Sequence, residues 1–380
     1  MTTSTHHHTV THALISRRRL LLGTAALGSA GALAACGVGA EGSASSTTAA
    51  SAQASPGTTT PSAASWSVPD PRSLTGLSTA ATLGDIEPVA SEVSPTLPVT
   101  VTDHDGNEVA VSDVSRIIAL DLTGNLSRTL AGLGLAGNIV GRTVSSTEPA
   151  LAALPVVTSN GHELNVEAVL SLSPTLVLAD VTVGTRDLLA QLSAAGVAVV
   201  ITNPDHTVDS LRADIEEVGA AVGLSEVASQ LAQRSEQELA QAQATIAQWT
   251  PQTAMRGVFL YMRGTAGIFF ILGKGEAAAA LLSGVGAEDA ATAQGLEGIV
   301  PATAEAVTQL DPEVIFCMAD GLESAGGLEG LMAKPGIAQT TAGTRQRVVA
   351  IPDGQSLAFG PQSGQILLET ARALYQPVEG

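Results

Sequence analysis

Short apolar runs alternate with amphipathic segments along most of the chain. Residues 116–120, 175–178 and 197–201 are four or five residues long, mostly apolar, and predict buried strands. Residues 187–195 place apolar side chains at helical spacing and predict a helix between two of these strands. Buried strands separated by helices are typical of a parallel, doubly wound sheet. The pattern therefore predicts an α/β protein.

One stretch of this pattern occurs twice. Residues 165–174 align with residues 303–312, and Glu, Ala, Val, Leu and Pro coincide at positions 138 apart. Each copy starts with a residue suited to cap a helix, Asn165 or Thr303, and ends in a proline that precedes an apolar strand. The duplication predicts two similar doubly wound lobes with the same order of elements and a ligand cleft between them.

A single long helix is expected to join the two lobes. Residues 224–249 contain no Gly or Pro and are rich in Ala, Gln, Glu and Leu. A helix of that length extends over roughly 40 Å, enough to bridge two lobes that lie side by side. We therefore expect an N-terminal lobe at residues 96–222, the connecting helix at residues 223–250 and a C-terminal lobe at residues 251–380.

The N-terminus has the parts of an export signal. Three arginines at residues 17–19 precede an apolar run at residues 20–35 that ends in small residues. We expect a signal peptide at residues 1–35 and an extracytoplasmic protein, exported by the Sec or the Tat route. The residues before Cys36 resemble a bacterial lipobox, which implies a lipid on this thiol that anchors the protein to the cell membrane. The alternative is an ordinary signal peptide followed by an incidental cysteine.

Composition sets further limits. Residues 36–95 are mostly Ser, Thr, Ala, Gly and Pro, so we expect a disordered tether that buries too little apolar surface to fold. The formal net charge of −19 argues against nucleic acid as a partner and against any membrane contact beyond the lipid. The chain has no Gly-x-Ser-x-Gly elbow, and Cys36 and Cys317 are its only cysteines. We therefore expect a binding protein and not an enzyme.

Two local motifs, at residues 160–165 (NGHELN) and 261–264 (YMRG), indicate the ligand class. Together with the lipobox, the tether, the two lobes and the long helix, they resemble the actinobacterial haemin-binding lipoproteins of HmuT type. These belong to the class III solute-binding proteins that serve ABC importers for haem, siderophores and cobalamin. The resemblance implies that haem b is bound as a transported ligand. It also implies an ABC permease and its ATPase as partners, in iron acquisition, with surface haem receptors as candidate donors.

The resemblance also implies the iron ligands. His162 and Tyr261 would bind the haem iron on its two axial sides, one from each lobe, and Arg263 would hydrogen-bond the tyrosine. The chemistry of these residues agrees, because ferric iron is a hard acid that favours a phenolate oxygen, and an imidazole completes six-coordination. Tyr261 also falls at the carboxyl end of a predicted strand, where α/β sheets bind ligands. Taken singly, a strand tyrosine is more often a packing residue and a loop histidine is more often solvated.

Other residues receive weaker assignments. Arg142 and Lys274 are candidate contacts for the haem propionates, and His206 is a candidate cleft contact. The duplicated motif places Glu167 and Glu305 at matching positions in the two lobes. By resemblance they would dock on arginines of the permease, although a helix dipole alone explains an acid in a first turn.

Two rival ligands remain open. A ferric siderophore or cobalamin would suit the same fold, but siderophore sites usually need cationic and aromatic side chains, which are scarce here. A metal-ion site would need several converging His, Asp and Glu ligands, and His104 is expected in a hairpin turn away from the cleft.

Overall fold

The computed structural model describes residues 70–159, 162–264 and 267–376 of the 380. The expected signal peptide, Cys36 and most of the expected tether lie outside these residues. None of the helices in the described part combines the length and the apolar character that a bilayer-spanning helix needs.

The N-terminal lobe is built on a four-stranded parallel sheet with strand order β5-β4-β8-β9. The central strands are fully buried, as their unbroken apolar sequences predict. The strands of this lobe are β2 (Val99–Thr102), β3 (Glu108–Val111), β4 (Ile117–Leu120), β5 (Ile139–Gly141), β6 (Thr158–Ser159), β7 (Glu163–Leu164), β8 (Leu176–Ala179) and β9 (Ala198–Ile201). Its helices are α1 (Asn125–Gly132), α2 (Val166–Ser171), α3 (Arg186–Ala194) and α4 (Leu211–Ala221).

The C-terminal lobe is built on a mixed sheet in which β15, β14 and β10 run parallel and β11 and β13 are antiparallel to their neighbours. Its strands are β1 (Leu77–Thr79), β10 (Arg256–Arg263), β11 (Ile268–Leu272), β12 (Glu288–Asp289), β13 (Ile299–Pro301), β14 (Val314–Met318) and β15 (Val348–Ile351). Its helices are α6 (Ala277–Gly284), α7 (Ala290–Ala293), α8 (Ala304–Leu310), α9 (Ala319–Ser324), α10 (Gly327–Met332), α11 (Thr341–Arg345), α12 (Asp353–Ser356) and α13 (Ser363–Tyr375).

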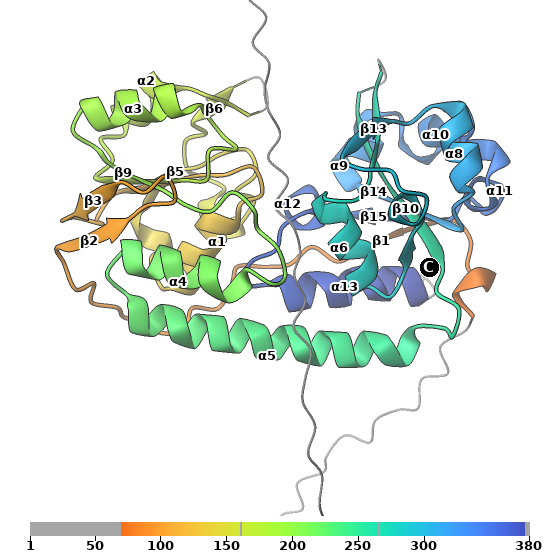
Figure 1. Cartoon of the computed structure of the whole chain (residues 1–380), viewed down its shortest axis with the longest axis horizontal. Coiled ribbons are helices and arrows are strands. Elements are labelled where there is room, and N and C mark those ends of the chain that lie inside the picture. The colour runs from red at the N-terminus through yellow and green to blue at the C-terminus, as the bar shows by residue number, and fades with distance from the viewer. Residues whose placement is uncertain (1–69, 160–161, 265–266, 377–380) are drawn as a thin grey trace, which may run out of the picture. The chain divides into compact units, whose positions relative to one another are not determined.

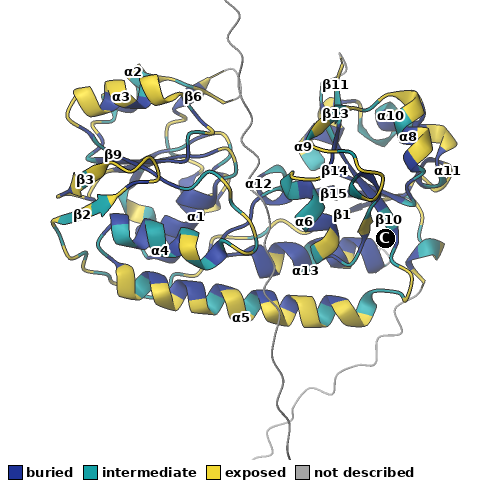
Figure 2. Cartoon of the chain, viewed as in Figure 1, coloured by how far each residue is buried: buried dark blue, intermediate teal, exposed yellow. Residues whose placement is uncertain are grey.

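The predicted connecting helix is confirmed as α5 (Ser225–Trp249). It packs on α4 of the N-terminal lobe and on α13 of the C-terminal lobe (Figure 1). Its buried residues recur every three or four positions, so one edge faces the lobes while the outer side is exposed (Figure 2). Glycines permit the close approach: a Cβ at Gly219 of α4 would lie 2.1 Å from the Cβ of Ala228, and a Cβ at Gly364 of α13 would lie 2.7 Å from the backbone of Glu238.

The predicted duplication is confirmed in the element order. Helices α2 and α8 each follow a side-chain cap and precede a buried strand, β8 or β14. The Asn165 side chain accepts a hydrogen bond from the amide of Ala168 at 3.0 Å, and Thr303 accepts one from Ala306 at 3.2 Å. Both caps satisfy amides that the first helical turn leaves unpaired.

The tether boundary expected at residue 95 is wrong. Strand β1 pairs in parallel with β15 of the C-terminal lobe, with Leu77 opposite Val348. Arg72 lies 2.8 Å from Glu313 in an ion pair of the same lobe. The C-terminal lobe therefore also includes residues that precede the N-terminal lobe in the sequence. The short strand was missed because its Leu-Ser-Thr sequence resembles the surrounding Ser/Thr-rich segment.

Candidate functional site

A cavity of about 410 Å³ lies between the two lobes. The N-terminal lobe lines it with Leu122, Thr123, Val144, Ser145, Thr147 and His162, and the C-terminal lobe with Tyr261, Arg263, Met318, Asp320, Asp353, Gly354, Leu357 and Ala358. Many of these residues follow the carboxyl ends of β4, β10, β14 and β15, the edge at which α/β sheets bind ligands. The structure thus brings His162, Tyr261 and Arg263 to one cavity, as the sequence predicted.

Tyr261 lies near the end of β10, opposite Phe270 of β11. Arg263 follows two residues later, and the alternation of a strand places both side chains on the same face. The guanidinium carbon of Arg263 lies 5.3 Å from the centroid of the Tyr261 ring, within the range of a cation–π contact. Its Nη2 atom lies 2.6 Å from Oδ2 of Asp353. Among the described residues, Arg263 contacts the tyrosine through the ring and donates no hydrogen bond to its hydroxyl.

His162 lies in the turn between β6 and β7, across the cavity from β10. It is exposed, and residues 160 and 161 of its motif lie outside the described residues. Partial burial of the imidazole against the cleft, and then the positive charge of Arg263, lower the pKa of His162. The imidazole is therefore neutral at pH 7, the form that binds a metal ion.

A second cavity of about 650 Å³ adjoins the first and shares Leu122, Thr123 and Leu357 with it. His206 lines this second cavity, but both of its ring nitrogens are engaged. Nε2 lies 3.2 Å from Asp180, and Nδ1 lies 3.1 Å from Asp214.

The two carboxylates decide the charge of His206. Burial lowers the pKa of its imidazole, but the hydrogen bonds and charges of Asp180 and Asp214 outweigh burial and raise it to about 10. Nearby, burial and then the charge of Asp180 raise the pKa of the fully buried Asp121 to about 6. His206 is therefore held as an imidazolium by acids of its own lobe.

The two candidate propionate contacts lie outside both cavities. Arg142 donates from Nη1 to the carbonyl oxygens of Thr143 and Ser146. Lys274 is exposed, and its Nζ lies 3.5 Å from Glu297.

Glu167, Glu305 and Cys317 lie away from both cavities. Glu167 and Glu305 are exposed in the first turns of α2 and α8, one on each lobe. Cys317 is buried in β14, where burial and then the charge of Asp353 raise the pKa of its thiol to about 12. A thiol in this state is inert at neutral pH.

Asp353 was not predicted from the sequence as a site residue. It follows β15 after one proline, in a Pro-Asp-Gly sequence at the carboxyl end of a parallel strand. The rule that singled out Tyr261 applies equally to this position.

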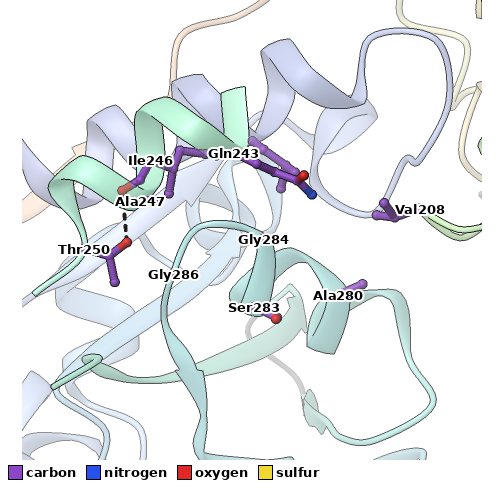
Figure 3. Close-up of a pocket in the computed structure, with 10 residues that line it drawn as sticks. Val208, Gln243, Ile246, Ala247, Thr250, Ala280, Ser283, Gly284 and Gly286 are labelled. Atoms are coloured by element: carbon purple, nitrogen blue, oxygen red, sulfur yellow. Dashed lines mark hydrogen bonds between the residues drawn. The ribbon is translucent and has the colours of Figure 1, made fainter. Parts of the chain in front are cut away.

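A further cavity of about 580 Å³ lies between α5 and α6 (Figure 3). None of its ten lining residues is ionisable, and Thr250 donates from Oγ1 to the carbonyl oxygen of Ile246 at 3.0 Å. Within the described ranges, no group of three or more His, Cys, Asp and Glu side chains is arranged to hold a metal ion.

Residues 120–354 match the family described as periplasmic binding protein. The chain belongs to this family. A crystal structure of the heme binding protein HmuT is 52% identical and superposes with a TM-score of 0.79, covering 81% of this chain and all of that one. The apo form of the periplasmic heme-binding protein RhuT from Roseiflexus sp. RS-1 is 33% identical, with a TM-score of 0.65, and covers 69% of this chain and 98% of that one.

A sequence relative is also a lipoprotein of a transporter. The uncharacterized ABC transporter substrate-binding lipoprotein YvrC of Bacillus subtilis (strain 168) is 27% identical over 288 residues, which cover 75% of this chain and 88% of that one. With the family, these relatives make the chain a binding protein of the transport class and not an enzyme.

Three further HmuT structures carry an alanine in place of a histidine, a tyrosine or an arginine. In HmuT the tyrosine stands 99 positions after the histidine, and the arginine stands 2 positions after the tyrosine. His162, Tyr261 and Arg263 have the same two spacings.

Proposed function

We propose that this chain is the lipid-anchored substrate-binding component of an ABC importer, and that it binds haem and delivers it to the membrane permease. The observation that carries the proposal is the cavity between the lobes that is lined by His162 from one side and by Tyr261 from the other. A flat porphyrin has two free axial positions on its iron, one on each face. Two protein ligands on opposite walls of a cleft suit such a molecule.

The chemistry of the two ligands supports ferric haem. A phenolate oxygen is a hard donor for ferric iron, and the lowered pKa of His162 keeps its imidazole free to bind from the other face. The guanidinium of Arg263 lies over the Tyr261 ring and places a positive charge beside this proposed ligand. The bound iron would be six-coordinate.

The rest of the cavity wall suits a porphyrin. Both lobes contribute apolar side chains to the wall, which can cover the faces of a porphyrin beside the polar groups of the cavity. The apolar lining residues are Leu122, Val144, Met318, Leu357 and Ala358. The three HmuT residues are of the same types and stand at the same intervals as His162, Tyr261 and Arg263, and this match supports the proposal separately from the cavity.

Delivery would use the outer faces of the lobes. Glu167 and Glu305 are exposed on matching helices and are available to pair with arginines of a permease. The lipid on Cys36 would keep the protein at the membrane. The docking rests on the resemblance and on the exposure of the two glutamates, and the lipid anchor rests on the resemblance to a lipobox.

A haemin titration followed by absorbance tests the proposal. The purified protein is expected to give a saturable one-to-one Soret change, and His162→Ala and Tyr261→Phe are each expected to alter the spectrum of the complex. The matched controls are His104→Ala, an exposed histidine outside both cavities, and Tyr375→Phe, whose buried hydroxyl donates to Val285.

The titration also separates the alternatives. If the unmodified protein shows no saturable change, the haem assignment is wrong, and ferric siderophores and cobalamin become the ligands to test. If the control variants alter the spectrum as much as the variants of His162 and Tyr261 do, the ligand assignment is wrong.

A further inference from the structure

Arg263 is held on two sides by neighbours within its own lobe. Its Nη2 atom pairs with Oδ2 of Asp353 at 2.6 Å and also reaches Sδ of Met318 at 3.5 Å. The guanidinium lies over the ring of Tyr261 on the other side. Arg263 is therefore placed between an acid and the proposed iron ligand.

The space behind the guanidinium is closed. A Cβ at Gly321 of α9 would lie 2.7 Å from Nη1 of Arg263 and equally close to the carbonyl oxygen of Met262. Only a glycine at this position leaves room for the observed placement. Gly321 therefore leaves room for the guanidinium on one side, and the carboxylate of Asp353 pairs with it inside the cavity.

Hydrogen bonds fix both the carboxylate of Asp353 and the backbone of the residue that follows it. Its Oδ1 atom accepts a hydrogen bond from the backbone amide of Asp320 at 2.9 Å, which leaves Oδ2 for Arg263. The next residue, Gly354, accepts a hydrogen bond through its carbonyl oxygen from the buried Arg128 of the N-terminal lobe at 2.8 Å. This hydrogen bond from the N-terminal lobe fixes the start of α12 and, with it, the backbone of Asp353.

We propose that Asp353 is a positioning residue: it keeps the Arg263 guanidinium beside Tyr261 and so strengthens the bond from this tyrosine to the haem iron. The inference rests on the proposed function and extends it to a residue that does not touch the iron. A free arginine has many side-chain conformations, and most of them would place its charge away from the phenolate. The ion pair with Asp353 removes this freedom before haem arrives.

Asp353→Ala tests the proposal, and Asp187→Ala is its matched control. Asp187 carries the same charge, but it is exposed in the first turn of α3 and lines neither of the two cavities. We expect Asp353→Ala to speed haemin release to excess apomyoglobin by about tenfold, the fold-change that corresponds to one charge-assisted hydrogen bond. Asp187→Ala is expected to release haemin as the unmodified protein does.

Three further readouts distinguish positioning from a merely structural role. The phenolate-to-iron charge-transfer band is expected to shift in Asp353→Ala, and Asp353→Glu is expected to restore both band and release rate. In an Arg263→Ala background, Asp353→Ala is expected to have no further effect, because the two residues act as one unit. Thermal unfolding of each variant checks that the fold is retained.

The outcomes that overturn the proposal are specific. Equal release rates from Asp353→Ala and Asp187→Ala, or a full additional effect of Asp353→Ala in the Arg263→Ala background, would show that Asp353 does not act through Arg263. Failure of the unmodified protein to bind haemin would instead overturn the proposed function, and this result is seen in the same experiment before any variant is compared.

Discussion

His206 is expected to make the protein less stable as the pH rises above neutrality. Its pKa is raised from 6.5 to about 10 in the folded protein, so the folded state retains a proton that the unfolded chain loses. This contribution to stability is fully present below pH 6.5 and is lost as the pH rises through 10. The difference between the two pKa values corresponds to at most about 5 kcal/mol of the free energy of unfolding.

Little of this energy should be lost to solvent screening, because the His206 side chain is only 6% exposed and the paired Asp180 side chain only 1% exposed. The perturbation is His206→Gln, which keeps a hydrogen-bonding side chain but cannot carry the charge. In this variant Asp180 and Asp214 have no cationic partner at any pH, so its free energy of unfolding at pH 6.5 is expected to be lower than that of the unmodified protein. This difference in the free energy of unfolding is expected to narrow toward pH 10, because His206 of the unmodified protein then loses its proton.

Urea unfolding at pH 6.5, 8 and 9.5 measures the difference in the free energy of unfolding between the two proteins. The control is His104→Gln, because His104 is exposed in the turn between β2 and β3 and touches neither Asp180 nor Asp214. A constant difference between the unmodified protein and His206→Gln across this range would refute the reasoning. Such a result would mean that His206 is not held as an imidazolium.

Three other predictions concern the lobe contact, the transporter and the thiol. Gly354→Ala would place a Cβ 2.0 Å from Oγ1 of Thr147 across the lobe contact, so we expect a loss of about 1–3 kcal/mol in unfolding experiments, partly restored by Thr147→Ala. Glu167→Ala and Glu305→Ala should keep haemin affinity within about twofold of that of the unmodified protein, because both residues are exposed. The same variants should lower haem uptake in vesicles that contain the permease. Unchanged uptake in the double variant would contradict docking through these glutamates. Cys317 should stay unreactive toward a thiol reagent at pH 8 until the protein is unfolded, because burial raises its pKa to about 12; rapid labelling of the folded protein would contradict its burial.

The sequence predicted the helices and strands that neighbouring residues specify. The connecting helix, the capped helices after Asn165 and Thr303, and the buried parallel strands are each specified by contiguous residues, and the structure confirms them. Strand β1 could not be found in this way. Its three residues form a strand because they pair with β15, which lies about 270 positions later in the sequence.

The sequence predicted only part of the candidate site, because some of its residues lie in local motifs and others are recognised only by contacts with distant residues. His162, Tyr261 and Arg263 lie in motifs that can be identified in isolation, and they share one cavity. Arg142 and Lys274 line neither cavity: Arg142 donates to backbone carbonyl oxygens, and Lys274 pairs with Glu297. Asp353 lies just after a parallel strand, as a ligand-binding residue would, but its ion pair with Arg263 is seen only in the structure.

A crystal structure of the haemin complex would show which side chains bind the iron. We expect one haem between the lobes, with the imidazole of His162 and the phenolate of Tyr261 on opposite faces of the iron, and with Arg263 still paired to Asp353. Iron bound by other side chains, or a haem seated in the second cavity beside His206, would contradict the proposed function.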